Sequence, residues 1–246
     1  MVKPVSFRAA LAATVRPLVG AHRGASDDYP ENTPASFSAA AAQGADFWEL
    51  DVRLSADGVP MVVHDAAIDR TTRGHGLVRK LTATMLEGYG VPALATVLGL
   101  GAGRTYFNVE LKTDGDSSEL AAAVADVIAA LRLEHHILVS SFDHDSLPLI
   151  KAASPALLTG ILYETRLTDP VGYARERGAD AIHPYFRLAG GRLCNAARDA
   201  GLIVVPWTVD RTLYLRYFAA IGAQAVITNR PATAVALYKN LITRHS

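Results

Sequence analysis

The sequence predicts an α/β protein built as a (β/α)8 TIM barrel, with a β-hairpin and a small insertion after the second strand. Short β-rich apolar runs alternate with alanine- and leucine-rich helical runs along all 246 residues, a pattern typical of parallel sheets covered by helices. Eight such pairs without linker composition favour a closed barrel over an open doubly wound sheet. The length lies within the range that such barrels fill as one unit, so we expect residues 1–246 to form a single domain.

Recurring helix-end signals define the expected helices and strands. Four helical runs end in glycine before the next apolar run, in AAQGADF, RERGADA, RDAGLIV and AAIGAQA, and glycine at this place is a common helix C-cap. Thr33-Pro34 is typical of an N-cap followed by proline in the first helical position. The expected strands are residues 17–22, 47–54, 105–112, 136–142, 157–163, 180–184, 202–209 and 224–228. The expected helices are residues 34–43, 93–100, 118–133, 144–153, 169–177, 189–200, 212–221 and 231–243.

One further strand is expected at residues 60–64, PMVVH. It follows the second strand after only the turn at residues 55–58, which is too short for a crossover helix, so it must pair antiparallel as a hairpin. Residues 66–92 have no strong period and contain four glycines. We interpret them as a small insertion over the barrel mouth.

Composition excludes several classes of protein. The chain has 24 basic and 24 acidic residues, so no basic face for nucleic acid is indicated. A single cysteine, Cys194, excludes an internal disulfide and fits the cytoplasm better than the periplasm. The apolar run before Arg16 is too short for a signal peptide and predicts a short docking helix, and no transmembrane segment is expected. The sequence carries no signal of oligomeric state.

Reactive residues collect at the carboxyl ends of the first three expected strands, where the active sites of these barrels lie. His22 and Arg23 end the first strand, and the hairpin returns His64 to the same rim. Side chains two residues apart share one face of a strand, which applies to Glu49 and Asp51 and again to Glu110 and Lys112.

Three carboxylates without cysteine partners predict an oxygen-ligand site for a hard divalent cation, Mg²⁺ or Ca²⁺, with Mn²⁺ as a third candidate. The cation would offset the repulsion among Glu49, Asp51 and Glu110 and polarise a phosphoryl oxygen, while Arg23 and Lys112 hold the others. The two histidines form an acid-base pair. The competing interpretation makes the acids rim charges paired with Arg53 and Lys112, and each histidine a structural residue; their concurrence at one barrel end favours the site.

The motifs resemble those of the glycerophosphodiester phosphodiesterases, whose barrel is related to that of the phosphatidylinositol-specific phospholipases C. The matching segments, in family order, are HRG at 22–24, PENTPASF at 30–37, ELDV at 49–52, DG at 57–58, VVHD at 62–65, DRTTRGHG at 69–76, VELK at 109–112, SSFD at 140–143, PWTVD at 206–210 and ITNRP at 227–231. Two positions depart from the family pattern. Thr96 stands where an acid is usual, and Asn229 replaces the aspartate of ITDRP.

The resemblance implies hydrolysis of a small-molecule glycerophosphodiester to glycerol 3-phosphate and an alcohol. It matches His22 and His64 to the acid-base pair, Glu49, Asp51 and Glu110 to the metal ligands, and Arg23 and Lys112 to the phosphate contacts. It also places Glu31 and Asn32 in a loop that supports the metal site. Trp207 is expected either to wall the substrate pocket or to pack in the core.

Two alternatives remain open at this point. The same machinery could act on a sugar phosphodiester or a lysophospholipid headgroup. A non-catalytic phosphate-binding barrel would lack one of the histidines or carboxylates, and none is missing.

Overall fold

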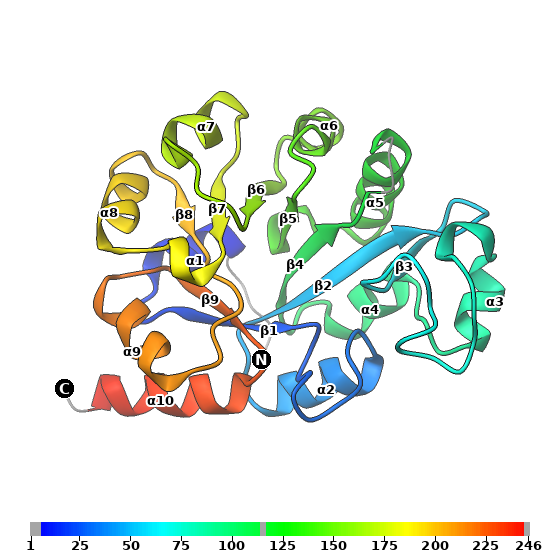
Figure 1. The fold of residues 1–246 in the computed structure, drawn as a ribbon, viewed down its shortest axis with the longest axis horizontal. Coiled ribbons are helices and arrows are strands. Elements are labelled where there is room, and N and C mark those ends of the chain that lie inside the picture. Colours follow the sequence, from blue (N-terminus) through cyan, green and yellow to red (C-terminus); the bar gives the residue numbers. More distant parts are fainter. Residues whose placement is uncertain (1–5, 114–116, 244–246) are drawn as a thin grey trace.

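A computed structural model describes residues 6–113 and 117–243 and confirms the barrel. The helices form an outer ring around the strands (Figure 1). The strands are β1 Leu18–His22, β2 Phe47–Leu54, β3 Pro60–Val62, β4 Tyr106–Leu111, β5 Ile137–Ser141, β6 Leu158–Tyr163, β7 Ala181–Pro184, β8 Ile203–Val204 and β9 Ala225–Thr228. The α-helices are α1 Phe7–Ala13, α2 Pro34–Ala42, α3 Ala83–Gly88, α4 Leu94–Gly101, α5 Ser118–Leu131, α6 Ser146–Ala153, α7 Pro170–Glu176, α8 Gly191–Asp199, α9 Thr212–Ala220 and α10 Pro231–Thr243.

Eight parallel strands run in the order β8-β7-β6-β5-β4-β2-β1-β9, and β3 pairs antiparallel with β2, as the hairpin prediction requires. The two ends of this order meet through the chain that follows β8. Val209 N–H donates to the Ile227 carbonyl at 2.8 Å, and Ile227 N–H donates to the Pro206 carbonyl at 3.0 Å. The ring of strands is therefore nearly closed.

The predicted strand 202–209 is too long, because β8 ends at Val204. Val205 N–H and Trp207 N–H still donate to the carbonyls of Ile182 and Pro184 on the β7 side. Pro206 between them has no N–H to donate toward β9, so no regular ladder forms on that side although the apolar run continues. The hairpin strand ends at Val62 rather than at residue 64, which leaves His64 on irregular chain at the rim.

The local signals at helix ends behave as predicted. Thr33 caps α2 in a reciprocal capping box with Ser36. The four predicted C-cap glycines, Gly44, Gly178, Gly201 and Gly222, all have φ between 64° and 84°, a region in which glycine carries no steric penalty.

Helix α1 closes the amino-terminal end of the barrel, which agrees with the predicted docking helix. Phe7 stacks on Tyr106 with ring centroids 4.7 Å apart and lies 5.3 Å from the ring of Phe47. Phe7 and Leu11 are buried with the inward side chains at the starts of the strands. Because this end is filled by apolar side chains, the opposite end is left for polar ones.

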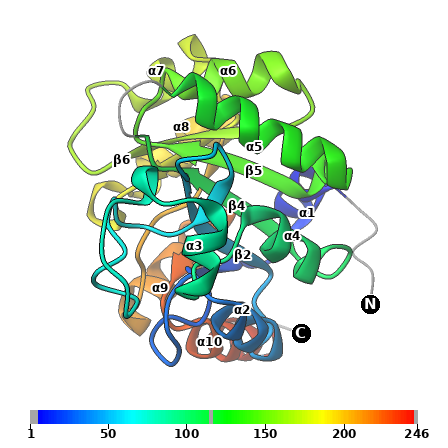
Figure 2. The same cartoon turned by 90° about the vertical axis from the view of Figure 1, so that its right-hand side faces the viewer.

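The insertion after the hairpin has a small apolar core of its own, and it lies outside the strands on the side that faces the viewer in Figure 2. That core comprises Met61, Val63, Ile68, Val78, Leu86 and Val91. The insertion also forms the short helix α3 and a 3-10 turn, η1 Val78–Lys80. Neither was predicted, because residues 66–92 show no strong hydrophobic period. Two further 3-10 turns are η2 Glu134–His136 and η3 Phe186–Leu188. None of the described helices is both long enough and apolar enough to cross a membrane.

His183 on β7 is a buried histidine that points into the barrel. It is 0% exposed, its ring packs against Gly160, and in the described part of the chain neither ring nitrogen has a hydrogen-bond partner. Burial lowers the pKa of His183 to about 3, so the native ring stays neutral where an unfolded histidine, with a pKa of about 6.5, takes up a proton.

The low pKa of His183 makes the free energy of unfolding depend on pH. Above about pH 6.5 the stability is complete, and as the pH falls the unfolded chain gains a proton that the native chain does not, at a cost of about 1.4 kcal/mol per pH unit. Between roughly pH 6 and pH 4, we expect the unfolding free energy of His183→Gln to fall less steeply than that of wild type, by about 1.4 kcal/mol per pH unit. Urea titrations would measure it, with the exposed His135→Gln as control. Equal slopes in wild type and His183→Gln would contradict the assignment.

Candidate active site

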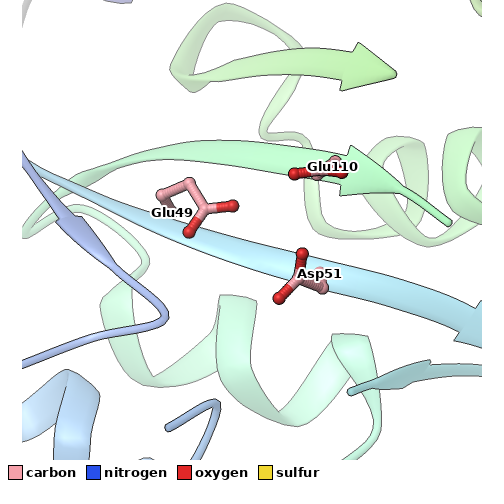
Figure 3. A group of neighbouring side chains, drawn as sticks. All are labelled: Glu49, Asp51 and Glu110. Atoms are coloured by element: carbon pink, nitrogen blue, oxygen red, sulfur yellow. The ribbon is translucent and has the colours of Figure 1, made fainter. Parts of the chain in front are cut away.

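Three carboxylates meet at the carboxyl ends of β2 and β4. Glu49 and Asp51 project from β2, and Glu110 projects from β4 toward the same space (Figure 3). Asp51 lies opposite Glu110 in the register of the two strands, and one oxygen of each of the three acids lies within 4.8 Å of the others. All three are buried, with at most 7% of their surface exposed. The period-two spacing of the sequence thus produces one compact cluster.

The three acids respond differently to this crowding. Burial, and then the charge of Asp51, raises the pKa of Glu49. Burial also raises the pKa of Glu110, against the opposing charge of Lys112. Burial acts in the same direction on Asp51, but Lys112 and Arg23 outweigh it and lower the pKa of this carboxyl. Asp51 is therefore the fixed negative charge of the cluster.

Arg23 contacts this cluster with both its backbone and its side chain. Its N–H donates to Glu49 Oε2 at 2.9 Å, and its Nε lies 3.1 Å from Asp51 Oδ2. The backbone adopts φ 55°, a left-handed conformation uncommon for a residue with a side chain. This bend turns the N–H and the guanidinium toward the same strand, β2.

Lys112 lies on the other side of the acids. Its Nζ is 3.2 Å from Asp51 Oδ1 and also forms an ion pair with Glu110. When all three carboxylates are ionised they face two cations, which leaves one net negative charge in a buried space. A phosphodiester would be repelled by that charge, whereas one divalent cation would reverse its sign.

The residues present fit a divalent metal ion. The donor set is made of carboxylate oxygens alone, the ligand type that Mg²⁺ and Ca²⁺ prefer, and the donor atoms already converge within 4.8 Å. Isolated buried like charges are costly, and a divalent cation held between the three acids would offset that cost.

The loop between β1 and α2 supports the cluster. Asn32 is buried and donates from Nδ2 to Asp51 Oδ2 at 2.9 Å, while its own N–H donates to the Arg23 carbonyl at 2.9 Å. Glu31 accepts from Arg23 Nη1 at 3.0 Å. The structure therefore brings Asn32 against an expected ligand and Glu31 against an expected phosphate contact.

The two histidines have different hydrogen-bond partners. His22 Nδ1 lies 2.6 Å from the amide oxygen of Asn229, and His64 Nδ1 lies 2.6 Å from a carboxylate oxygen of Asp65. Burial lowers the pKa of both imidazoles. In each ring a hydrogen on Nδ1 satisfies the partner, which leaves Nε2 for a substrate.

The amide of Asn229 is fixed by Asp210. Asn229 donates from Nδ2 to Asp210 Oδ2 at 2.7 Å, and its Oδ1 also accepts from the Ser26 hydroxyl at 2.9 Å. These contacts leave only one orientation of the amide consistent with hydrogen bonding. Asn229, which stands where the family motif has aspartate, is thus held in one orientation with its amide oxygen toward His22.

An open cleft of about 300 Å³ lies beside His22 and Arg23. An aromatic group made of Phe142, Tyr185 and Trp207 lies on the far side of Lys112, whose Nζ is 5.7 Å from the Phe142 ring centroid. Trp207 contacts both other rings, at centroid distances of 5.5 and 5.8 Å, and its indole N–H donates to the His183 carbonyl at 2.8 Å. Trp207 is half-buried at this wall.

Sequence reasoning did not single out Arg70, Asp65 or Asp210, although each contacts a residue that it did name. Arg70 is ion-paired with Glu31 and Asp65. The signal was present, since Arg70 lies in DRTTRGHG and Asp210 in PWTVD. Nothing in those motifs showed which side chains they would meet.

The chain is similar to known proteins of one family. The model of the glycerophosphoryl diester phosphodiesterase family matches residues 22–233. A glycerophosphodiester phosphodiesterase of Caldanaerobacter subterraneus is 32% identical over 92% of this chain and 99% of its own. A solved structure of a putative glycerophosphoryl diester phosphodiesterase from Silicibacter pomeroyi has a TM-score of 0.85, 25% identity, and coverage of 94% and 98% of the two chains. That of an Oleispira antarctica phosphodiesterase in complex with the product sn-glycerol-3-phosphate has a TM-score of 0.80, 27% identity, and coverage of 91% and 97%.

The carboxylate cluster leads to a prediction on cation binding. A divalent cation at about 100 times its Kd should add about 2.7 kcal/mol of stability, which for a chain of this length is roughly 5–10 °C in Tm. We expect Glu49→Gln to lose most of this shift. Without the cation the same variant should be at least as stable as wild type, because a buried repulsion with Asp51 is removed. Thermal unfolding with and without Mg²⁺, Ca²⁺ or Mn²⁺ measures both effects.

The exposed Asp126→Asn on α5 serves as control and should keep the full shift. An equal cation-dependent rise in Tm for Glu49→Gln and wild type would show that the ion binds elsewhere.

Proposed function

This chain belongs to the glycerophosphoryl diester phosphodiesterase family, and from that premise we propose that it hydrolyses glycerophosphodiesters to glycerol 3-phosphate and an alcohol, with His22 and His64 as the acid-base pair. One observation carries the proposal. The carboxylate cluster, its two cations and the two histidines with free Nε2 positions all gather at one end of the barrel.

Glu49, Asp51 and Glu110 would hold a divalent cation, Mg²⁺, Ca²⁺ or Mn²⁺, which supplies Lewis-acid polarisation of a phosphoryl oxygen. Arg23 and Lys112 stand on either side of the acids and would bind the remaining phosphoryl oxygens. Asn32 and Glu31 keep Asp51 and Arg23 in place. Trp207 and its aromatic neighbours offer an apolar surface on the side of Lys112 away from this cluster.

The partners of the histidines support an assignment of their roles. Asp65 places a carboxylate on His64, which favours its protonated ring, whereas Asn229 places a neutral amide on His22. We therefore assign His22 Nε2 as the base that takes the proton of the attacking hydroxyl. The attacking oxygen forms the new bond to phosphorus, the bond to the alcohol oxygen breaks, and His64 gives its proton to the leaving alkoxide.

The attacking hydroxyl is either water or the 2-hydroxyl of the substrate glycerol, the second route being that of the related phospholipases. In the second route the attack releases the alcohol and leaves a cyclic phosphodiester, which water then opens to glycerol 3-phosphate. Both routes use the same two histidines. A cytoplasmic location, expected from the cysteine content, stays a prediction.

The test of function is release of glycerol 3-phosphate from a panel of glycerophosphodiesters by metal-stripped protein, with Mg²⁺, Mn²⁺ or Ca²⁺ restored. We expect turnover to return with a cation and to rank the alcohol groups. Sugar phosphodiesters and lysophospholipids belong in the same panel. Turnover of those alone would replace the glycerophosphodiester, and no turnover of any of them by folded protein would contradict the proposal.

The role assignment predicts a dependence on the leaving group. A nitrophenolate can leave without being protonated, whereas an alkoxide such as that of choline must receive a proton as it leaves. We expect His64→Ala to lose at least roughly 100-fold in kcat on the choline diester and far less on the nitrophenyl diester. His22→Ala should lose a similar factor on both.

The reverse pattern, with His22→Ala the variant rescued by nitrophenyl, would exchange the two roles. Near-normal turnover of both variants on the choline diester would remove both histidines from the chemistry. Circular dichroism of each variant establishes that it is folded.

A further inference from the structure

Arg70 joins the insertion to both sides of the candidate site. Its Nε lies 2.5 Å from Asp65 Oδ2, and its two terminal nitrogens lie 3.0 and 2.7 Å from the two oxygens of Glu31. A guanidinium can hold two carboxylates in this way because its donors form a rigid planar fork.

Each of these acids also contacts a residue of the proposed machinery. Asp65 uses its other oxygen, Oδ1, on His64 Nδ1 at 2.6 Å. Glu31 uses Oε1 on Arg23 Nη1 at 3.0 Å. Arg70 thus lies one side chain away from a candidate acid and one side chain away from a candidate phosphate contact.

The backbone around Arg70 is tied in place by the insertion. Ile68 is fully buried in the apolar core of the insertion. Its N–H donates to the Gly76 carbonyl at 3.0 Å, and the Thr72 N–H donates back to the Ile68 carbonyl at 3.1 Å. Asp69 accepts from the Gly76 N–H at 3.0 Å. These bonds hold the loop that carries Arg70 closed on itself.

We propose that Arg70 is a positioning residue of the phosphodiesterase reaction, which orients His64 through Asp65 and Arg23 through Glu31. This inference rests on the proposed function of the site. Without Arg70, Glu31 and Asp65 lose the cation that they share, and Asp65 is free to turn away from His64. Arg23 is then drawn toward Glu31 rather than shared with Asp51.

The simpler alternative is a surface ion pair. Arg70 is half exposed, and exposed pairs contribute about 0–1 kcal/mol to stability and nothing to turnover. The two interpretations differ in one respect that can be measured. A positioning role is transmitted through two particular carboxylates, whereas a general effect on stability is not.

The experiment compares Arg70→Gln with Arg70→Lys and with the control Arg79→Gln, which removes an exposed arginine from the same insertion. Outer partners of catalytic groups typically contribute 10- to 100-fold, so we expect Arg70→Gln to lose roughly that factor in kcat/KM, with kcat falling and KM rising. Arg70→Lys keeps the charge but not the fork and should recover only part of it. Arg79→Gln should match wild type.

Two further backgrounds test the route of the effect. In Asp65→Asn, the additional kcat loss caused by Arg70→Gln should nearly vanish, and in Glu31→Gln the additional rise in KM should nearly vanish. Equal losses in all three backgrounds would mean that Arg70 acts through stability alone. A kcat/KM for Arg70→Gln within about twofold of wild type would also overturn the proposal.

A spectroscopic measurement separates this inference from the proposed function. In ¹⁵N NMR spectra recorded at a pH at which the His64 ring is neutral, and assigned with a His64→Gln variant, wild type and Arg79→Gln should show one His64 tautomer, with hydrogen on Nδ1. Arg70→Gln should show a mixture. This readout needs no turnover, so an unchanged His64 signal in Arg70→Gln overturns the inference even if the enzyme acts on none of the tested substrates.

Discussion

The mutual repulsion of three buried carboxylates is the constraint on which the mouth of the barrel depends. Glu49, Asp51 and Glu110 are buried, and one oxygen of each lies within 4.8 Å of the others. At such distances and low dielectric, repulsion of like charges amounts to several kcal/mol. The surrounding polar contacts all reduce this repulsion, since Arg23 and Lys112 flank Asp51 and the amide of Asn32 donates to it.

The same constraint explains the conformation of the first loop. Arg23 can reach Asp51 with its side chain and Glu49 with its N–H only because its backbone turns into the left-handed region. Asn32 adopts a similar φ, 57°, and its N–H closes the loop on the Arg23 carbonyl. Such conformations cost about 1–3 kcal/mol each and persist where neighbouring contacts require them. Here the neighbouring contacts are those to the buried acids.

Most of the fold and the contents of the site could be predicted from sequence because both follow from local periodicity. Alternating side chains place Glu49 with Asp51 and Glu110 with Lys112 whatever the rest of the chain does. Glycines after helices mark where each helix ends. The early end of β8 and the contacts of Arg70 could not be predicted in this way. The first depends on a missing donor at Pro206 against a particular neighbour, and the second joins residues 39 positions apart.

Arg70, Asp65 and Asp210, which sequence reasoning did not single out, have one feature in common. Each contacts a side chain that sequence reasoning did name. Asp210 holds the amide of Asn229, which in turn contacts His22, and Asp65 contacts His64 itself. The sequence shows where a histidine stands, but the tautomer and the pKa of its ring depend on the side chain that hydrogen-bonds to it. Because His22 contacts an amide and His64 contacts a carboxylate, the two imidazoles differ in the charge of their neighbours. Asn229 therefore makes the environments of the two histidines unequal, and this difference is the one from which we assign one ring as the base and the other as the acid of the proposed reaction.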